Sequence, residues 1–536
     1  MQEETNNVFL KESDNEPLMR IALFESQDFL DLKIMGEFSV ADENGNMLIN
    51  PVTSELKWRV KIKDSKPGKE QFFIVLFESF QFELTEEKLK IAKKIDENVE
   101  IKRLGGNVYF KDKKINNNVK YVLTYGYFPT EIEARKNFKR FQPEFVPYVE
   151  KTVVKQSQGH LEAFDAEYEY SAEAANAMKI IPSNIQTKIK LFGIRSFEPI
   201  LQKYHHGDLV FNGTMEFRFD NHGSLMGVSE VPLETYLKRV VFSEVGSDLP
   251  YEFLKSFAIV ARSEAMARIG HVQLGAPYDY CNFGHSLRYM GIDYVDDNID
   301  KAVEETRGQV LTTKDYIRDT PFHLVCGGHT EDASGLWGSL EKPFFIGRYD
   351  WDEKPKNFTT LKNEKMAKKW IEDRPQVWCN LKGMKIPPAL EKYKQSFRWE
   401  ISYARRELED IIRKRTGEDI GTLFDIFPLS RGNSGRLNEI ELIGSLKNYR
   451  IRGQLNIREA LAYDYLPSSC FIVEKELDDT GTPIMFNFIG AGQGHGVGLC
   501  KTGAAVMAHD EKKFDKILKH YFEDSTLSSI YELDHD

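Results

Sequence analysis

The stretch VPLETYLKRVVFSEVG at residues 231–246, followed by DLPYEFLKSFAIVARSEA at residues 248–265, decides the fold of the larger part of this chain. Apolar residues recur at three- and four-residue steps on both sides of a break that contains Pro250, which predicts two helices joined by a short turn. Glu244 ends the first helix after three apolar residues. Apolar surroundings disfavour the charged form of a carboxyl group, and a general acid must hold its proton. Glu244 is therefore a candidate acid, and the alternative is that it only caps the turn.

Strand signals lie just before these helices. In DLVFNGTMEFRFD at residues 208–220, apolar and polar residues alternate as they do in strands with one buried face. We place the main domain at residues 195–536 and expect a mixed α+β fold with a central, antiparallel-rich sheet decorated by helices. No repeat of solenoid or propeller period occurs.

The preceding residues predict smaller units. Residues 1–66 indicate a small β-rich segment, residues 67–155 a strand–helix, strand–helix module, and residues 156–194, polar and rich in alanine, a linker or peripheral helix. Within the second unit, YVLTYGYFPTEIEARKNF at residues 121–138 resembles half of a SPOR domain, a module that binds glycan strands stripped of peptides. The alternative is an α+β insertion without that role.

Composition excludes several classes of protein. The chain has 536 residues, of which 41% are hydrophobic and 29% charged, as in ordinary folded proteins. Its formal charge of −11 argues against nucleic acid as a partner. No stretch approaches the roughly 18 apolar residues of a membrane-spanning helix. The start, MQEETNN, lacks the features of an export signal, so either the protein stays inside the cell or a signal has been trimmed from it.

The cysteines do not form the framework of a small secreted protein. Their number is odd and they are spread over more than about 200 residues. At most two disulfides can form among them, which leaves the redox compartment open. They are Cys281, Cys326, Cys379, Cys470 and Cys500.

The helical stretch resembles the signature of the SpoIID/LytB family, in which a "PLE-Y" helix runs into a catalytic glutamate and then into a "P-E-LK-QA-AAR" helix. The matching residues are Pro232, Leu233, Glu234, Tyr236, Leu237, Glu244, Pro250, Glu252, Leu254, Lys255, Ala258, Val260, Ala261 and Arg262.

Further blocks resemble the family in the same order along the chain. They are YDYCNFGHSLRYMG at 278–291, TRGQVLT at 306–312, FHLVCGGHTE at 322–331 with Trp337 shortly after, SGR at 434–436, and GAGQGHGVGLCKTGA at 490–504. The resemblance spans roughly the C-terminal three-fifths of the chain. It implies a peptidoglycan-processing domain outside the cytoplasm, in the cell envelope.

The resemblance implies a lytic transglycosylase that cleaves the bond between N-acetylmuramic acid and N-acetylglucosamine in denuded glycan strands. One carboxyl group, here Glu244, protonates the leaving oxygen and then accepts the proton of the sugar's 6-hydroxyl, which closes a 1,6-anhydro ring. Glycoside hydrolases instead use two carboxylates. The lack of an obvious second acid is therefore no objection, and no cofactor is required.

The glycine-rich block has five glycines in residues 490–498 around His495. Glycine lets backbone approach a ligand closely, so we interpret Gly494 and Gly496 as part of a glycan groove, with His495 as a second catalytic residue that orients substrate or acid. The alternative is a turn with a structurally bonded histidine. As further substrate-binding residues we expect Arg262, Tyr289 and Trp337, although Arg262 can instead tie down its helix and most aromatic residues are core. Glu331 and Asp332 are candidate auxiliary carboxylates, for which surface solvation is the alternative.

Cys281 and His285 have a spacing that suits a metal or a thiol pair, and some relatives bind zinc in this region with a second cysteine after the histidine. Here that position is Ser286, a departure that puts zinc in doubt because a structural site normally needs four ligands. His271 is the further candidate ligand, with Cys326 able to join it. A disulfide between Cys281 and Cys326 is the alternative.

A second function remains open. Members of the family were first described as amidase enhancers, so the chain is alternatively a non-catalytic glycan-binding protein that stimulates a cell-wall amidase. Departures from the family pattern at Ser286, Leu287, Cys500 and Lys501 motivate this alternative. A zinc amidase lacks an adequate ligand set.

Overall fold

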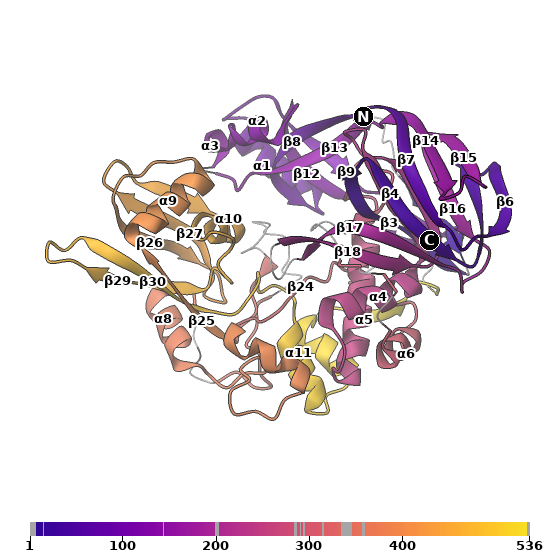
Figure 1. Cartoon of the computed structure of the whole chain (residues 1–536). Helices are drawn as coiled ribbons and strands as arrows, with labels where there is room; N and C mark the ends of the chain where they lie inside the picture. Colours follow the sequence, from indigo (N-terminus) through magenta and orange to yellow (C-terminus); the bar gives the residue numbers. More distant parts are fainter. Residues whose placement is uncertain are drawn as a thin grey trace.

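The structure is a computed structural model of the chain. It describes residues 7–13, 15–142, 144–198, 203–282, 287–289, 291–292, 295–313, 316–333, 346–355, 358 and 360–532, with only the backbone of residues 195–198 and 203–205. In Figure 1 two sheets with both chain ends form one side, helices lie below them, and a separate group of strands and helices forms the other side. The mixed, antiparallel-rich α+β fold expected from the sequence is confirmed.

The largest sheet combines the first strands of the chain with strands from its middle. Its order is β2-β3-β20-β19-β16-β5-β6, with antiparallel neighbours throughout, and β21 pairs parallel to β3. The bounds are β2 Glu12–Ser13, β3 Glu16–Gln27, β5 Glu37–Asp42, β6 Met47–Thr53, β16 Ala177–Pro182, β19 Thr214–Phe219, β20 Leu225–Pro232 and β21 Tyr280–Cys281.

A second antiparallel sheet has the order β15-β14-β7-β4-β17-β18. Its strands are β4 Phe29–Met35, β7 Lys57–Lys66, β14 Gln158–Asp165, β15 Ser171–Ala175, β17 Lys188–Glu198 and β18 Lys203–Phe211. The two sheets share one core: Phe38 on β5 and Trp58 on β7 pack edge to face, with ring centroids 5.3 Å apart.

Two of the expected domain boundaries differ from this topology. Residues 1–66 do not form a unit of their own, because β3 pairs with β20 of the expected main domain, with Leu18 opposite Pro232. Residues 156–194 are not a linker but strands of both large sheets. In β15, Ala172 and Ala174 alternate with exposed residues. Small alanine side chains give a weak hydrophobic signal, which is why this strand was not predicted.

The strand–helix, strand–helix pattern expected in residues 67–155 is present. The sheet order β13-β8-β12-β9 with these connections is that of a split βαβ unit, with a separate hairpin inserted between β9 and β12 and paired to β1. The elements are β1 Val8–Phe9, β8 Lys69–Ser79, α1 Phe82–Ala92, β9 Val99–Leu104, β10 Asn107–Phe110, β11 Lys113–Asn117, β12 Lys120–Phe128, α2 Glu131–Arg135, α3 Phe138–Phe141 and β13 Tyr148–Lys155. Thr130 caps α2, because its side chain accepts a hydrogen bond from the Glu133 N–H.

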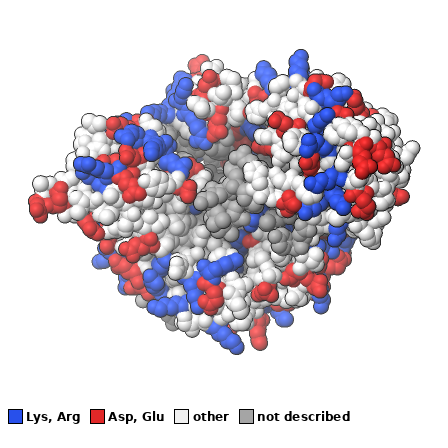
Figure 2. All heavy atoms as spheres, viewed as in Figure 1, with Lys and Arg blue, Asp and Glu red and all other residues white. Residues whose placement is uncertain are grey.

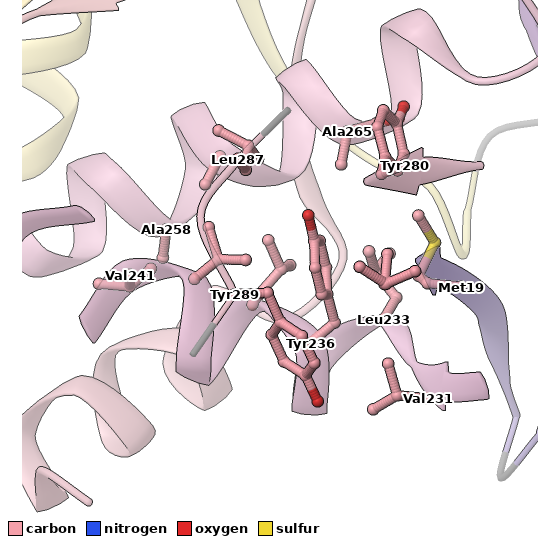
Figure 3. Packing of buried hydrophobic residues seen from close by; sticks show 14 of the residues in the cluster. Met19, Val231, Leu233, Tyr236, Val241, Ala258, Ala265, Tyr280, Leu287 and Tyr289 are labelled. Carbon is pink, nitrogen blue, oxygen red and sulfur yellow. The ribbon is translucent and has the colours of Figure 1, made fainter. Parts of the chain in front are cut away.

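The two helices that open the main domain also form as expected. Helix α4 spans Leu233–Val245 and α5 spans Tyr251–Arg268. Gly246, with φ of 79°, ends the first helix, and Pro250 precedes the second. Their apolar faces pack with the end of β20 and with β3 in the main core, which includes Met19, Val231 and Leu233 (Figure 3). The packing of α4 against β3 and β20 of the largest sheet fixes the direction in which α4 ends.

The remaining elements include those labelled at the left and along the bottom of the molecule in Figure 1. Small sheets have the orders β23-β22-β32, β24-β31, β25-β30-β29 and β26-β27-β28. Bounds are α6 Asp297–Glu305, β22 Gln309–Thr313, β23 Tyr316–Ile317, β24 Phe322–His323, α8 Glu364–Asp373, the 3₁₀ helix η1 Pro388–Ser396, β25 Arg398–Ala404, α9 Arg405–Thr416, β26 Leu423–Arg431, β27 Leu437–Gly444, β28 Tyr449–Arg452, α10 Gln454–Ala460, β29 Phe471–Leu477, β30 Pro483–Ala491, β31 Leu499–Cys500, α11 Lys501–His509, α12 Phe514–Tyr521 and β32 Thr526–Ser529.

Acidic and basic residues intermingle over the face shown in Figure 2. The whole chain has a net charge of −11. None of the helices in the described ranges has the length and apolar character needed to cross a bilayer.

Candidate functional site

The carboxyl group of Glu244 lies in the last turn of α4 with its side chain 18% exposed. Its Oε1 accepts a hydrogen bond of 3.1 Å from the backbone N–H of Arg288, and its Oε2 lies 3.2 Å from the Nζ of Lys501. Lys501 also donates to the main-chain oxygen of Glu244, at 3.0 Å. A carboxylate at a helix C-terminus faces the negative end of the helix dipole, so the Lys501 ammonium offsets an unfavourable position and satisfies one terminal carbonyl.

A shallow recess adjoins this carboxyl group. It is lined by α4 and α5 residues, by Leu390 and Tyr393 of η1, and by Lys501 and Thr502 of α11. Its free volume of about 10 Å³ is close to the space that one water molecule needs. A sugar ring does not fit inside it, so a glycan bound at Glu244 would lie across this surface rather than within a closed pocket.

The glycine-rich block reaches Glu244 through its C-terminal end. The block runs from β30 into β31, and Lys501 follows β31 directly. Strand β31 pairs parallel to β24, which places Leu499 beside Phe322. The Lys501 ammonium lies 5.2 Å from the centre of the Phe322 ring. Residues far apart in sequence, at 244, 322 and 501, therefore meet at one place.

His495 is held by backbone groups on both sides of its ring. The Val497 N–H donates to its Nδ1 at 3.1 Å, and the ring is hydrogen-bonded to the backbone of Phe322. Burial lowers the pKa of His495 well below 6.5, and the neighbouring His323 and Arg436 lower it further. The imidazole is therefore neutral at physiological pH. The structurally bonded histidine considered as the alternative describes this geometry, and a catalytic role for His495 stays a prediction.

Gly494 and Gly496 face the interior rather than an open groove. A side chain at Gly496, where φ is 85°, would bring its Cβ to 2.5 Å from the Arg436 guanidinium carbon. A Cβ at Gly494 would meet His323 at 2.9 Å. Arg436 is fully buried and donates to the carbonyl oxygens of Gly494 and Cys326. The glycines thus let the backbone close around a buried arginine. Gly496 is buried, which corrects the expectation that it binds substrate, while substrate binding by the half-buried Gly494 stays a prediction.

Two further expected substrate contacts are also wrong. Arg262 is 0% exposed, and its guanidinium forms a two-pronged ion pair with Glu234, which joins α5 to α4. Gly308 and Tyr531 donate to the same carboxylate. Tyr289 is 0% exposed as well and packs against Tyr236, with ring centroids 5.3 Å apart (Figure 3). Neither side chain can reach a ligand, because each is part of the core.

The "SGR" block and the end of the "CGGHTE" block meet through Glu331, which is 1% exposed rather than solvated at the surface. Its carboxylate accepts hydrogen bonds from the Ser434 hydroxyl at 2.5 Å and from the Asn433 N–H at 3.0 Å. Burial raises the pKa of Glu331, while the Ser434 hydroxyl and Arg436 oppose the shift. The Glu331 carboxyl group therefore anchors the loop that contains Asn433 and Ser434. The resemblance of these two blocks to the family pattern thus has a structural explanation.

The expected metal ligands do not come together in the parts of the chain that the structure describes. His285, an expected ligand, and Trp337, an expected substrate-binding residue, both lie outside the described residues. Cys281, on β21, and His271, whose ring nitrogen Nδ1 lies 3.2 Å from the Asn118 carbonyl, belong to no group of three close donors in the described parts of the chain. All five cysteines are described and none forms a disulfide, so the Cys281–Cys326 disulfide is absent.

Comparison with known proteins identifies the central segment. Residues 221–313 match the family model described as Stage II sporulation protein, SpoIID, and include α4, α5 and Glu244. This segment is therefore similar to the SpoIID family. Residues 331–498, downstream of the SpoIID match, correspond to a domain of unknown function, DUF8618. Lys501, which pairs with the glutamate of the SpoIID match, lies beyond both matched ranges.

Relatives of the chain are distant in sequence. An uncharacterized protein of Brachyspira hyodysenteriae is 25% identical over 377 residues, 68% of this chain and 86% of that protein. The stage II sporulation protein D of Bacillus amyloliquefaciens is 24% identical over 328 residues, 58% of this chain and 77% of that protein. The amidase enhancer of Bacillus subtilis is 24% identical over 309 residues, 55% of this chain but only 40% of that protein.

Sequence reasoning missed Lys501 as a partner of Glu244. The available signal was the departure from the family's closing "G-x-S-Q-x-GA" pattern, in which lysine stands at the glutamine position. A lysine placed where a polar neutral residue is expected indicates a nearby acid, but the sequence does not say which one. The pairing joins residues 257 positions apart.

Proposed function

We propose that this chain is a peptidoglycan lytic transglycosylase that acts on denuded glycan strands outside the cytoplasm, with Glu244 as its acid and base. The observation that carries the proposal is the position of this carboxyl group: partly exposed at the end of α4, within a segment matched by the SpoIID family model, and held by Arg288 N–H and Lys501. The names of the relatives, stage II sporulation protein D and amidase enhancer, support a role at the cell wall.

The proposed reaction needs one proton carrier. Protonated Glu244 gives its proton to the glycosidic oxygen as the bond to the anomeric carbon of N-acetylmuramic acid breaks. The resulting carboxylate then takes the proton of the 6-hydroxyl, whose oxygen bonds to the same carbon and closes the 1,6-anhydro ring. No water is consumed, and the carboxyl group regains its proton. Because the acid must start protonated, the ion pair with Lys501 has to open when the glycan arrives.

The test is digestion of peptide-free glycan strands followed by mass spectrometry of the new ends. The full chain should release 1,6-anhydro-muramic ends, and Glu244→Gln should lower the rate at least about 100-fold, the usual contribution of a general acid. Glu304→Gln on α6, whose side chain is 58% exposed, is the control with the same chemical change. Full release of anhydro ends by Glu244→Gln would disprove the assignment.

A second candidate is a glycan-binding protein that enhances a cell-wall amidase. The ion pair between Lys501 and Glu244 favours it, because it engages the carboxyl group that the lytic reaction requires. The similarity to the amidase enhancer supports it too. In that case the chain binds denuded glycan without forming anhydro ends, and the wild type and the Glu244→Gln variant increase the turnover of an added amidase equally well.

A further inference from the structure

Three cysteines and one aspartate from four separate segments converge in the interior. Their ligand atoms, the Sγ atoms of Cys326, Cys379 and Cys500 and a carboxylate oxygen of Asp350, all lie within 4.8 Å of one another. Cys326 Sγ is 3.3 Å from Cys379 Sγ and 3.1 Å from Asp350 Oδ2. All four residues are at most 2% exposed. Of the four, only Cys326 was considered as a metal ligand from the sequence, and with other partners.

The spacing fits a tetrahedral ion. With zinc–sulfur bonds of about 2.3 Å, two sulfurs of a tetrahedral site lie about 3.8 Å apart, and a sulfur and a carboxylate oxygen about 3.6 Å apart. The observed separations of 3.1 and 3.3 Å and the upper limit of 4.8 Å bracket these values. An ion at the centre therefore requires the two measured separations to widen by about 0.5 Å and the remaining ones to change by at most about 1.2 Å.

Groups around the cluster orient the ligands as the outer shell of a metal site does. The Tyr521 hydroxyl donates a hydrogen bond to Oδ1 of Asp350 at 2.8 Å. The other carboxylate oxygen of Asp350, Oδ2, faces the Cys326 sulfur. The Gly328 N–H donates to the Cys326 sulfur at 3.2 Å, and the Gly503 N–H to the Cys500 sulfur at 3.4 Å. These donors stabilise thiolates, which are the form of cysteine that binds metal.

Cys500 is also the N-cap of α11, a nine-residue helix, so its sulfur faces the positive end of the helix.

We propose that Cys326, Cys379, Cys500 and Asp350 form a structural zinc site. Sulfur-rich tetrahedral sets select zinc among the common divalent ions. On binding, the thiols that still carry protons release them to solvent, so that three thiolates and one carboxylate surround Zn²⁺. The ion crosslinks the loop after β24, the segment around Asp350, the turn after α8 and the start of α11.

The site bears on the position of Lys501, which follows Cys500 directly. Most of the chain between Leu324 and Phe397 is irregular where it is described, apart from α8 and η1, so a metal crosslink here fixes segments that secondary structure does not. The crosslink fixes Cys500, the residue directly before Lys501, and Lys501 in turn contacts Glu244 at the end of α4. The zinc site does not depend on the lytic activity, and its test is independent of the glycan assay.

The experiment measures metal and thiols in the full chain, produced in zinc-supplemented medium and freed of loosely bound metal. Inductively coupled plasma mass spectrometry should find about one zinc per chain, and Cys379→Ser and Cys500→Ser should lose most of it. Cys281→Ser and Cys470→Ser are matched controls, since both remove a buried cysteine outside the cluster, and they should keep the zinc.

A second measurement keeps the test valid if a cluster variant fails to fold. The wild-type chain is denatured with a chromogenic chelator, and released zinc and reactive thiols are counted together. About one zinc and five thiols are expected. Each of four results would overturn the assignment. They are five thiols without metal, two thiols missing because of a disulfide, iron in place of zinc, and zinc lost from Cys281→Ser but kept by the cluster variants.

Discussion

The ammonium of Lys501 is the residue-scale feature that most directly controls the proposed acid. Both partners are largely buried, at 15% and 18% exposure, so solvent screens the pair only in part. Replacing Lys501 by glutamine removes the positive charge that pairs with the Glu244 carboxyl group. We expect the rate of anhydro-end formation to rise about fivefold, for a pair that contributes about 1 kcal/mol.

Lys516→Gln on α12, with the same loss of charge at a 73% exposed position, controls for net charge and should leave the rate unchanged. A fall of the Lys501→Gln rate to that of Glu244→Gln would show instead that the lysine takes part in the proton transfers.

His329 gives a residue-scale prediction about pH. Its imidazole is 5% exposed and donates from Nδ1 to the Thr330 carbonyl. Burial, and to a smaller extent Lys354, lowers the pKa of His329 from 6.5 to about 4. As the pH falls from 6.5 towards 4, the unfolded chain binds a proton at this residue and the folded chain does not. The stability present above pH 6.5 is therefore lost in this window, by about 2 kcal/mol at pH 5.

In the His329→Asn variant, the asparagine side chain keeps a hydrogen-bond donor for the Thr330 carbonyl but has no group that titrates between pH 4 and 6.5. Urea denaturation at pH 8 and pH 5 should show the variant losing about 2 kcal/mol less than the wild type between these conditions. Equal losses in the two proteins would contradict the burial of a neutral imidazole at this position.

At the scale of elements, the Arg262–Glu234 ion pair joins α4 to α5 inside the core. Removing one buried charge leaves the other unpaired, which typically costs about 3–5 kcal/mol, whereas removing both is often close to neutral. Arg262→Met should therefore lower the free energy of unfolding by this amount, measured from urea denaturation. The double variant Arg262→Met with Glu234→Leu should recover most of the loss. A double variant less stable than Arg262→Met would mean that packing, not charge, dominates.

Local signals explain which elements could be predicted. The break at Pro250 acts on its immediate neighbours, so the helices on either side of it, α4 and α5, were recognised from a few residues. The partner of β3 was not predictable in this way, because it is chosen among strands about 200 residues away by packing of the whole core. Arg262 illustrates the same limit: the motif identified the residue, but only the tertiary structure shows that it faces Glu234 rather than a ligand.

Part of the site was predictable and part was not. Glu244 could be identified because it sits in one continuous stretch with a recognisable pattern. Lys501 and the cysteine cluster could not, since their partners come from segments separated by up to 257 and 174 positions and no spacing rule connects them. His495 shows a third case, in which the residue was noticed but backbone hydrogen bonds now explain its place.

At the scale of the molecule, the N-terminal strands and the segment similar to the SpoIID family share one sheet and one core. Met19, Ile21, Leu23 and Phe24 of β3 are at most 1% exposed. Burial of four such side chains contributes about 6–12 kcal/mol, comparable with the whole stability of a domain. A chain that starts at residue 195 should therefore show no cooperative thermal unfolding by circular dichroism.

Co-expression with residues 1–194 is the control and should restore a cooperative transition. A stable, cooperatively unfolding fragment from residue 195 onward would show that the expected boundary at 195 is a true domain boundary after all.

The pairing of Leu18 with Pro232 also has a consequence for how the protein is made. Synthesis proceeds at about 5–20 residues per second, so roughly 10–40 seconds pass between the emergence of β3 and that of its partner β20. During that interval the apolar side chains of β3 lack the partner strand that covers them in the folded protein.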